Sequence, residues 1–233
     1  MAALKNRDSA INKLVKGTSF ESTLFDNFRD DEEIVLMAIK KGAFFKYASD
    51  NLKDDRDFVI QAINLRSESY IWASNRLKSD RELAINAISQ NGRNIDHAPK
   101  ELQVDIELLK LALKTNGSAI YNTETDSPHR YDKELALLAV KNDGMVLDAF
   151  APSITNDKEV ALEAVKKDQF ASMKFGKELK QLLDTNELKK SKDIIDFLEQ
   201  RVREEKIEKS YNQLKASMTS NTTQSNQSKK IKL

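Results

Sequence analysis

The hydrophobic positions of this chain recur in a unit of about 25 residues, seen most clearly in DRELAINAISQNGRNIDHAPKEL from Asp80 to Leu102. Each unit begins with an aspartate, and apolar residues follow three, seven and eight positions later. Since positions 3, 4, 7 and 8 of a helix share one face, the spacing predicts an amphipathic helix at the start of every unit. Six units begin in this way, at Asp31, Asp55, Asp80, Asp105, Asp132 and Asp157.

The aspartate, the second acid and the alanine that recur in each unit each have a physical explanation. The aspartate is predicted to cap its helix by accepting a bond from an unpaired backbone N–H. An acidic residue two positions later suits the positive end of the helix dipole. A row of cation sites is the alternative interpretation of these acids, and it is less favoured because no third ligand recurs. An alanine stands seven residues after every aspartate, where a larger side chain would push a neighbouring helix away. These alanines are Ala38, Ala62, Ala87, Ala112, Ala139 and Ala164.

Glycines are predicted to end the first helix of most units. A glycine follows the alanine by four or five residues, and it adopts the left-handed conformation of a helix terminus at little cost. A second, shorter apolar stripe then runs to a closing Leu52, Leu77, Leu102, Ile154 or Leu179. Each unit is therefore expected to be a helical hairpin. Neither helix exceeds the ~12–15 residues that are marginal in isolation, so hairpins must bury their stripes against each other.

The chain is accordingly predicted to be all-α, with six helical-hairpin repeats over residues 31–183 stacked as an α-solenoid. Residues 1–30 are expected to form an N-terminal capping unit, because the outer face of a terminal repeat meets water. Residues 184–216 contain a long helix, and its irregular apolar spacing favours a cap over the last repeat rather than a dimer zipper. Residues 217–233 are polar and of low complexity, which predicts a disordered tail. The stripe of the long helix consists of Ile195, Leu198, Val202, Ile207, Tyr211 and Leu214.

The sharpest candidate for a binding surface is a column five residues past the glycine position, which carries Tyr47, Trp72, His97 and Asn122 at intervals of 25. In a regular array these side chains line one edge, where an extended peptide could bind. The alternative, favoured on the sequence alone, is that they fill gaps between hairpins beside small alanines.

The fourth unit supplies a second candidate. The polar, proline-containing run Thr123–Tyr131 replaces its second stripe and predicts a loop. The loop is either a functional insertion or a bend in the array. Binding residues favour loops on rigid scaffolds, which makes His129, Arg130 and Tyr131 candidate protein-binding residues.

The composition of the chain argues against several classes of function and site. The chain has 38 basic and 37 acidic residues, and a net charge of +1 does not favour nucleic acid as a partner. It has no cysteine, which excludes disulfides, cysteine-ligated zinc and a thiol nucleophile. The N-terminus shows no secretory signal and no run reaches the ~18 apolar residues of a membrane span, so a cytoplasmic protein is expected. Neither His97 nor His129 has an evident catalytic partner, and catalytic residues, cofactors and metals are all predicted to be none.

The units resemble the domain of unknown function numbered four-one-one-six. The stretches DDRDFVIQAI…YIWASNRLKSD and SDRELAINAI…HAPKEL carry the resemblance, which covers roughly Asp31 to Leu179. It implies a tandem helical array with no established activity, in a family found notably in protists and in bacteria that live within them.

The leading functional hypothesis is a non-enzymatic protein-interaction scaffold or adaptor, because repeat arrays present extended surfaces. Its protein partner is unidentified, and a monomer is favoured. The polar tail, with KKIKL at Lys229–Leu233, resembles both a nuclear import signal and a type IV secretion signal. It adds the hypothesis of an effector that an intracellular bacterium translocates into a host cell. The alternative interpretation of the tail is a solvated segment that aids solubility. The alternative function is an enzyme or accessory factor with its site at the 123–131 loop.

Overall fold

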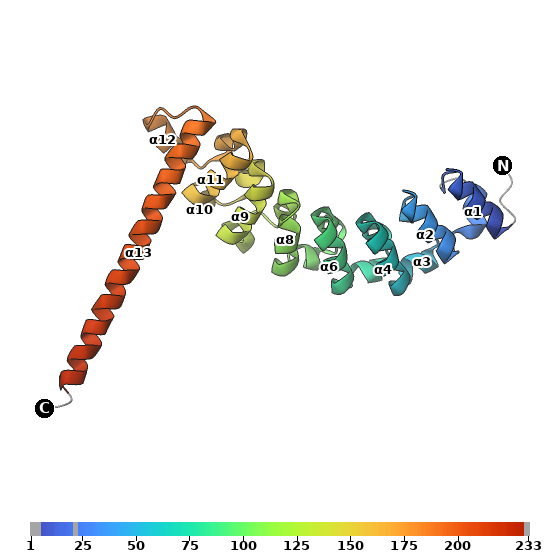
Figure 1. The fold of residues 1–233 in the computed structure, drawn as a ribbon, viewed down its shortest axis with the longest axis horizontal. Coiled ribbons are helices and arrows are strands. Elements are labelled where there is room, and N and C mark those ends of the chain that lie inside the picture. The colour runs from blue at the N-terminus through green and yellow to red at the C-terminus, as the bar shows by residue number, and fades with distance from the viewer. Residues whose placement is uncertain (1–5, 21–22, 231–233) are drawn as a thin grey trace.

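The computed structural model describes residues 6–20 and 23–230, with side chains described over 6–20 and 25–217. Every regular element within these residues is helical. The elements form an elongated, curved array from which one long helix projects (Figure 1). The predicted all-α repeat fold is confirmed. Parts of the predicted N-terminal cap (residues 1–5 and 21–22) and of the predicted tail (residues 231–233) lie outside the described residues.

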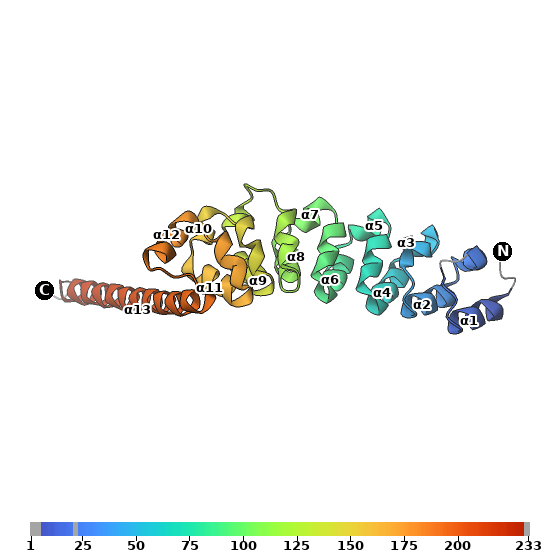
Figure 2. The same ribbon diagram turned by 90° about the horizontal axis from the view of Figure 1, so that it is seen from above.

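Each of the six units opens with an α-helix, and these helices stand in one row along the array (Figure 2). The aspartate of every unit is the N-cap, and its side chain accepts from a backbone N–H in the first turn, as predicted. The six helices are α2 (Glu32–Lys40), α4 (Arg56–Leu65), α6 (Arg81–Gln90), α8 (Ile106–Leu113), α9 (Lys133–Asn142) and α11 (Lys158–Lys167).

The second arm of each unit is divided rather than being one helix. A 3-10 helix comes first, and a second short helix follows it after a buried residue, which is small in the first four units and a phenylalanine in the last two. In most units 14 residues separate the end of the first helix from the aspartate of the next unit, and tight 3-10 turns suit such short connections. The 3-10 helices are η2 (Phe45–Tyr47), η3 (Ser67–Trp72), η4 (Gly92–His97), η5 (Gly117–Asn122), η7 (Gly144–Ala149) and η8 (Gln169–Lys174). The short closing helices are α3 (Asp50–Asp54), α5 (Asn75–Lys78), α7 (Lys100–Gln103), η6 (Pro128–Tyr131), α10 (Pro152–Thr155) and α12 (Lys177–Thr185).

The glycines do not all have the conformation that the sequence predicts. Gly17 and Gly42 have positive φ, at +86° and +98°, as a left-handed helix end requires. Gly92, Gly117 and Gly144 do not, so the prediction is wrong for these three. Each of them instead lies against the backbone of the first helix in the following unit. Their requirement for glycine is steric.

Close approach accounts for Gly92, Gly117 and Gly144 and for the alanines that face them. A Cβ on Gly92 would overlap the carbonyl oxygen of Ala112, and one on Gly117 would lie 2.7 Å from the carbonyl oxygen of Ala139. The predicted contact between backbones at the alanines is thus present, and its partner is the glycine of the preceding unit. The sixth unit has the exposed Gln169 at the glycine position. A large residue fits there because no seventh repeat follows.

Successive units are also linked through their closing helices. The backbone N–H of Ser49 donates to the carbonyl of Arg29 (2.7 Å), and that of Ser74 donates to the carbonyl of Lys53 (2.8 Å). The same two serines cap α3 and α5 through their hydroxyl groups. Between the two rows runs one continuous hydrophobic core, which includes the fully buried alanine column and extends from Ala10 to Val202.

The two ends of the array differ. At the N-terminal end, α1 (Arg7–Val15) and η1 (Thr23–Phe28) precede the first full unit. At the C-terminal end, α13 (Ser191–Lys230) packs on α11 through Ile194, Leu198 and Val202. The first part of this helix therefore covers α11, the first helix of the last repeat.

The capping role does not extend along the whole of α13. The helix has 40 residues and α11 has ten, which correspond to about 60 Å and 15 Å at ~1.5 Å per residue. The predicted stripe is therefore only half buried, and Ile207, Tyr211 and Leu214 are exposed. The helical backbone also continues past residue 216 to Lys230 without a break, because neither glycine nor proline interrupts it.

Candidate functional site

The four side chains of the predicted column occupy equivalent places at the ends of 3-10 helices. Tyr47, Trp72, His97 and Asn122 are the last residues of η2, η3, η4 and η5. The residue after each of them is small and buried, which anchors the backbone in the core while the column residue lies at the surface. Trp72 is 37% exposed, His97 is also exposed, and Tyr47 and Asn122 are half-buried. The column thus forms an edge rather than a filling between units.

The first half of this edge is an aromatic cluster around a lysine. Lys46 Nζ lies 4.7 Å from the ring centre of Tyr47, 5.6 Å from that of Phe44 and 5.9 Å from that of Trp72. The Arg66 guanidinium lies 5.5 Å from the Phe44 ring and donates to the carbonyl of Gly42 (2.7 Å). Contacts of a cation with a ring face are attractive, and they hold these side chains in place at the surface. We call Phe44, Lys46, Tyr47 and Trp72 the aromatic edge.

The second half of the column is polar. Asn122 donates through Nδ2 to Asp96 Oδ1 (2.8 Å), and the Asn122 carbonyl accepts a bond from Lys100 Nζ (2.5 Å). These bonds link the third and fourth units across the edge. The surface therefore changes from aromatic and cationic at the first and second units to hydrogen-bonding groups at the third and fourth. The sequence column identified Tyr47 and Trp72 but missed Phe44 and Lys46, which belong to a different register.

The irregular run Thr123–Tyr131 is fastened to the array by Arg130. The Arg130 side chain is buried, and its guanidinium donates to the carbonyls of Thr123 (2.6 Å), Glu124 (3.1 Å) and Ala149 (2.6 Å) and to the Thr123 hydroxyl (3.1 Å). Arg130 therefore bridges the fourth unit and η7 of the fifth. Its donors are directed at main-chain groups of its own chain rather than at the surface.

The other two candidates of this run differ from each other. His129 Nε2 lies 3.0 Å from the carbonyl oxygen of Val104, which ties the run to the loop before α8. Tyr131 is 58% exposed and presents its ring outward. The predicted loop is also shorter than expected, because its last four residues form η6 in place of a closing α-helix. Of the three candidates, Tyr131 is the one whose side chain is available to a partner.

The acidic starts of the units take part in ion pairs between neighbouring repeats. Arg56 Nε lies 2.8 Å from Asp80 Oδ2, and its Nη2 lies 2.6 Å from Glu82 Oε2. Arg7, Arg81 and Lys133 bridge the two acids of the next unit in the same way. The Arg7 hydrogen bond holds the pKa of Asp31 below its ordinary value. Both acids therefore have a cationic partner in the first, third, fourth and sixth units. Three of these four cations directly follow the aspartate of the preceding unit, a sequence signal that could have revealed them.

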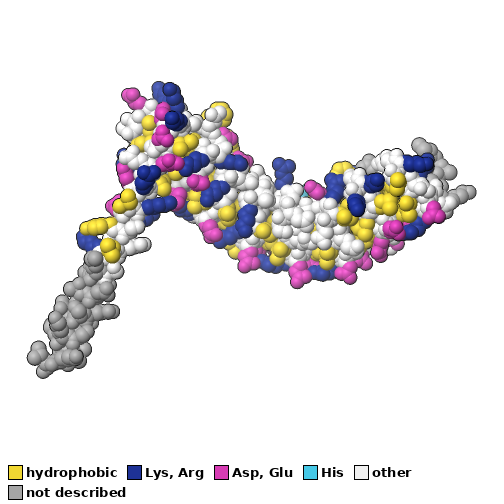
Figure 3. Space-filling model, viewed as in Figure 1, with side chains coloured by type: hydrophobic (Ala, Val, Ile, Leu, Met, Phe, Trp, Pro, Cys, Tyr) yellow, Lys and Arg dark blue, Asp and Glu magenta, His cyan; other side chains and the backbone are white. Residues whose placement is uncertain are grey.

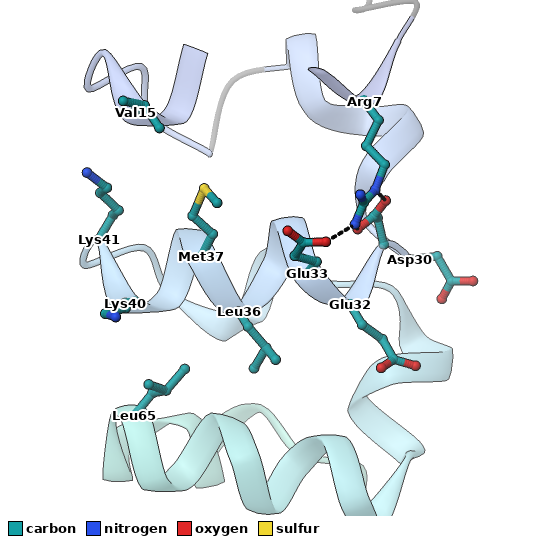
Figure 4. Close-up of a pocket in the computed structure, with 11 residues that line it drawn as sticks. Arg7, Val15, Asp30, Glu32, Glu33, Leu36, Met37, Lys40, Lys41 and Leu65 are labelled. Carbon is teal, nitrogen blue, oxygen red and sulfur yellow. Dashed lines mark hydrogen bonds and ion pairs between the residues drawn. The ribbon is translucent and has the colours of Figure 1, made fainter. Parts of the chain in front are cut away.

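A groove lies over the outer face of α2, between α1 and α4 (Figure 4). It has a volume of about 1060 Å³. Met37 points toward Val15 of α1, and Leu36 points toward Leu65 of α4. Acidic side chains, including Glu33, lie at the N-terminal end of α2, whereas Lys40 and Lys41 lie at its other end. The hydrophobic side chains on this face of the N-terminal end are visible in Figure 3, with basic groups beside them.

Two classes of site are absent from the described part of the chain. No helix there is both long and apolar enough to cross a lipid bilayer. No group of three or more histidine, aspartate or glutamate side chains among residues 6–20 and 23–230 is arranged to bind a metal ion.

Comparison with protein families gives one match. Residues 31–78, 80–124 and 132–180 each match the model of a domain of unknown function (DUF4116). Each match spans two of the six units, and the third begins after the run that Arg130 fastens. No curated protein and no solved structure matches the chain.

Proposed function

Because most of this chain belongs to the DUF4116 family of tandem helical repeats, we propose that it is a non-enzymatic scaffold that binds an extended segment of another protein along the aromatic edge. The exposed cluster of Phe44, Lys46, Tyr47 and Trp72 is the observation on which this proposal rests. Rigid aromatic side chains lose little conformational entropy on binding, and they dominate the energetics of protein interfaces.

The arrangement of the edge favours an extended partner over a globular one. Successive column residues are 25 positions apart and lie in adjacent units, so a strand-like segment crosses them one after another. The cations Lys46 and Arg66 at the aromatic end suit a carboxylate of the partner. Asp96 and Asn122 at the other end offer hydrogen-bonding groups to its backbone. A short acidic segment that contains an apolar residue for the Trp72 ring is the expected ligand.

Trp72 also makes the proposal testable, because it is the single tryptophan of the chain. Peptides selected from a random displayed library against the full chain are expected to shift its fluorescence. In calorimetric titrations, which do not depend on the tryptophan signal, Trp72→Ala or Tyr47→Ala is expected to weaken a selected peptide roughly 30-fold, which corresponds to the ~2 kcal/mol of an interface hot spot. Ile85→Ala, at an exposed position on α6, is the matched control and leaves binding unchanged. The proposal fails if no peptide is selected, or if selected peptides bind both edge variants as tightly as the wild type.

The cellular setting is a second part of the proposal. The polar sequence 217–233 and its basic end favour a protein that acts in the cytoplasm of a host cell after translocation by an intracellular bacterium. A translocation reporter fused to the chain with and without residues 217–233 tests this setting. Equal delivery of both fusions, or delivery of neither, contradicts it.

A further inference from the structure

Two exposed hydrophobic surfaces lie at opposite ends of the array. One is the projecting half of α13, residues 207–217, where Ile207, Tyr211 and Leu214 are 64%, 63% and 55% exposed. These residues share one helix face, and Figure 3 shows hydrophobic side chains on α13 just before the grey segment. The other surface is the groove over α2. The contact between α13 and α11 shows how two such surfaces fit.

The contact of α13 with α11 is antiparallel and is framed by two ion pairs. Lys166 Nζ of α11 lies 2.7 Å from Glu199 Oε1 of α13, and Lys206 Nζ of α13 lies 2.9 Å from Glu159 Oε1 of α11. Between these pairs Leu162 is buried on α11, and Val202 is buried on α13. On each helix the acid, the apolar residue and the lysine are spaced at 0, 3 and 7. The shared spacing places opposite charges together when the helices run in opposite directions.

The same spacing occurs on both exposed surfaces. The α2 groove has Glu33, Leu36 and Lys40, and the projecting half of α13 has Glu208, Tyr211 and Lys215. In each case the acid and the lysine are seven residues apart, or about 10.5 Å along a helix at ~1.5 Å per residue. An antiparallel helix seated over α2 therefore brings Glu208 to Lys40 and Lys215 to Glu33. Its apolar stripe then covers Leu36 between them.

One other first helix has this spacing, and its charges are already used. On α9, Glu134 pairs with Lys110 of α8 (2.6 Å), and Lys141 lies 3.9 Å from Glu163 of α11. Glu33 of α2 pairs with Arg7 of α1, and Glu159 of α11 likewise pairs with Lys133 of α9. Lys40, by contrast, has no ion-pair partner among the described residues. The groove over α2 thus combines the spacing, an apolar floor and an available lysine.

We propose that the projecting half of α13 of one copy binds antiparallel in the α2 groove of a second copy. The docked helix lies on the outside of the seam between α1, α2 and α4, because α4 already occupies the position that α13 takes beside α11. The contact joins two different surfaces of the same chain. It is heterologous and leaves a free groove and a free helix at the two ends of a pair, so association continues into linear chains. This self-association departs from the monomer that the sequence favours.

The test uses the full chain and two variants that each disable one surface. Wild-type protein is expected to show a weight-average mass in sedimentation that rises more than about twofold with concentration. Leu36→Asp disables the groove, and Tyr211→Asp disables the helix, so each variant alone stays monomeric. An equimolar mixture is expected to form 1:1 dimers and nothing larger, because one functional groove meets one functional helix. Far-UV circular dichroism confirms that both variants fold.

Two control variants and an exchange of charge between the groove and the helix test the contact further. Ile85→Asp places the same substitution at the equivalent position of α6, and Asn212→Asp places it beside Tyr211 on the helix; both leave association intact. Lys40→Glu or Glu208→Lys alone weakens association about tenfold, and the double variant restores it. The proposal is overturned if the wild type stays monomeric at all concentrations, or if the mixture forms no dimer. It is also overturned if Tyr211→Asp abolishes association while Leu36→Asp does not, since that result identifies a zipper of two α13 helices.

Discussion

Replacing Gly92 by alanine tests why the repeat requires glycine. The added Cβ would overlap the carbonyl oxygen of Ala112 and lie 2.7 Å from Thr115 Oγ1, which now accepts a bond from the Gly92 N–H (2.9 Å). Overpacking costs ~1–3 kcal/mol, and the strained or lost hydrogen bond adds ~1 kcal/mol. The lower entropy of the unfolded chain offsets ~0.4–1 kcal/mol of this cost. A net loss of about 2–3 kcal/mol in the free energy of unfolding is expected.

Asparagine distinguishes a steric requirement from a conformational one. Gly42 has φ of +98°, and the nearest side-chain atom to an added Cβ is 4.0 Å away. Alanine there costs ~1–2 kcal/mol through left-handed strain, and asparagine, which visits that conformation readily, costs less. At Gly92 the order is reversed, because the larger side chain increases the overlap.

Urea unfolding followed by far-UV circular dichroism, with Trp72 fluorescence as a local probe, measures the four variants. The expected result is that asparagine is milder than alanine at position 42 and harsher than alanine at position 92. If Gly92→Ala is neutral, or if Gly92→Asn is milder than Gly92→Ala, close approach is not the reason for the glycine.

Two further predictions concern the charged side chains that join elements. Arg130→Met is expected to lower the free energy of unfolding by about 2–4 kcal/mol, because buried carbonyls of Thr123 and Ala149 lose their donors, at ~1–3 kcal/mol each. Arg130→Lys recovers only part of this loss in the same urea assay, since one ammonium cannot reach in two directions; full recovery would contradict the bridging role. Hydrogen bonds from Lys206 and Lys133 lower the pKa of Glu159 from 4.5 to about 2, so this group stabilises the fold above pH 4.5 and its contribution is lost as the pH falls toward 2. The difference in unfolding midpoint between wild type and Glu159→Gln is therefore expected to shrink over that range, and a difference independent of pH would refute the assignment.

The features that follow from local physics could be predicted from the sequence. An aspartate before an amphipathic run caps a helix whatever surrounds it, and all six aspartates do so. The alanine column also indicated close packing correctly, because a small residue fixed within an apolar stripe leaves space that only a neighbouring backbone fills. The division of the second arm could not be predicted in the same way. Its 3-10 helices have no distinct residue preference, and an apolar stripe of that length fits either helix type.

The errors at Gly92, Gly117 and Gly144 have a tertiary cause. A glycine four or five residues after the last helical alanine is equally compatible with a left-handed helix end and with contact from a neighbouring repeat. The carbonyl that excludes a side chain belongs to the following unit, some 20 residues away in the chain, so local rules do not detect it. The aromatic edge was predicted only in part for a related reason. Tyr47 and Trp72 occupy a position that recurs at the repeat interval, whereas Phe44 and Lys46 do not.

The irregular fourth unit has a structural role at its seam with the fifth unit. At three seams a cation directly after the aspartate bridges both acids of the next unit, as Arg81 does, but position 106 is an isoleucine. At this seam Lys110 pairs with Glu134, and Arg130 reaches the carbonyl of Ala149 in the next unit. Arg130 thus bridges a seam that lacks the regular ion pairs. The fourth unit thus has a structural explanation for its irregularity, whereas the Trp72 ring on the regular edge is 37% exposed.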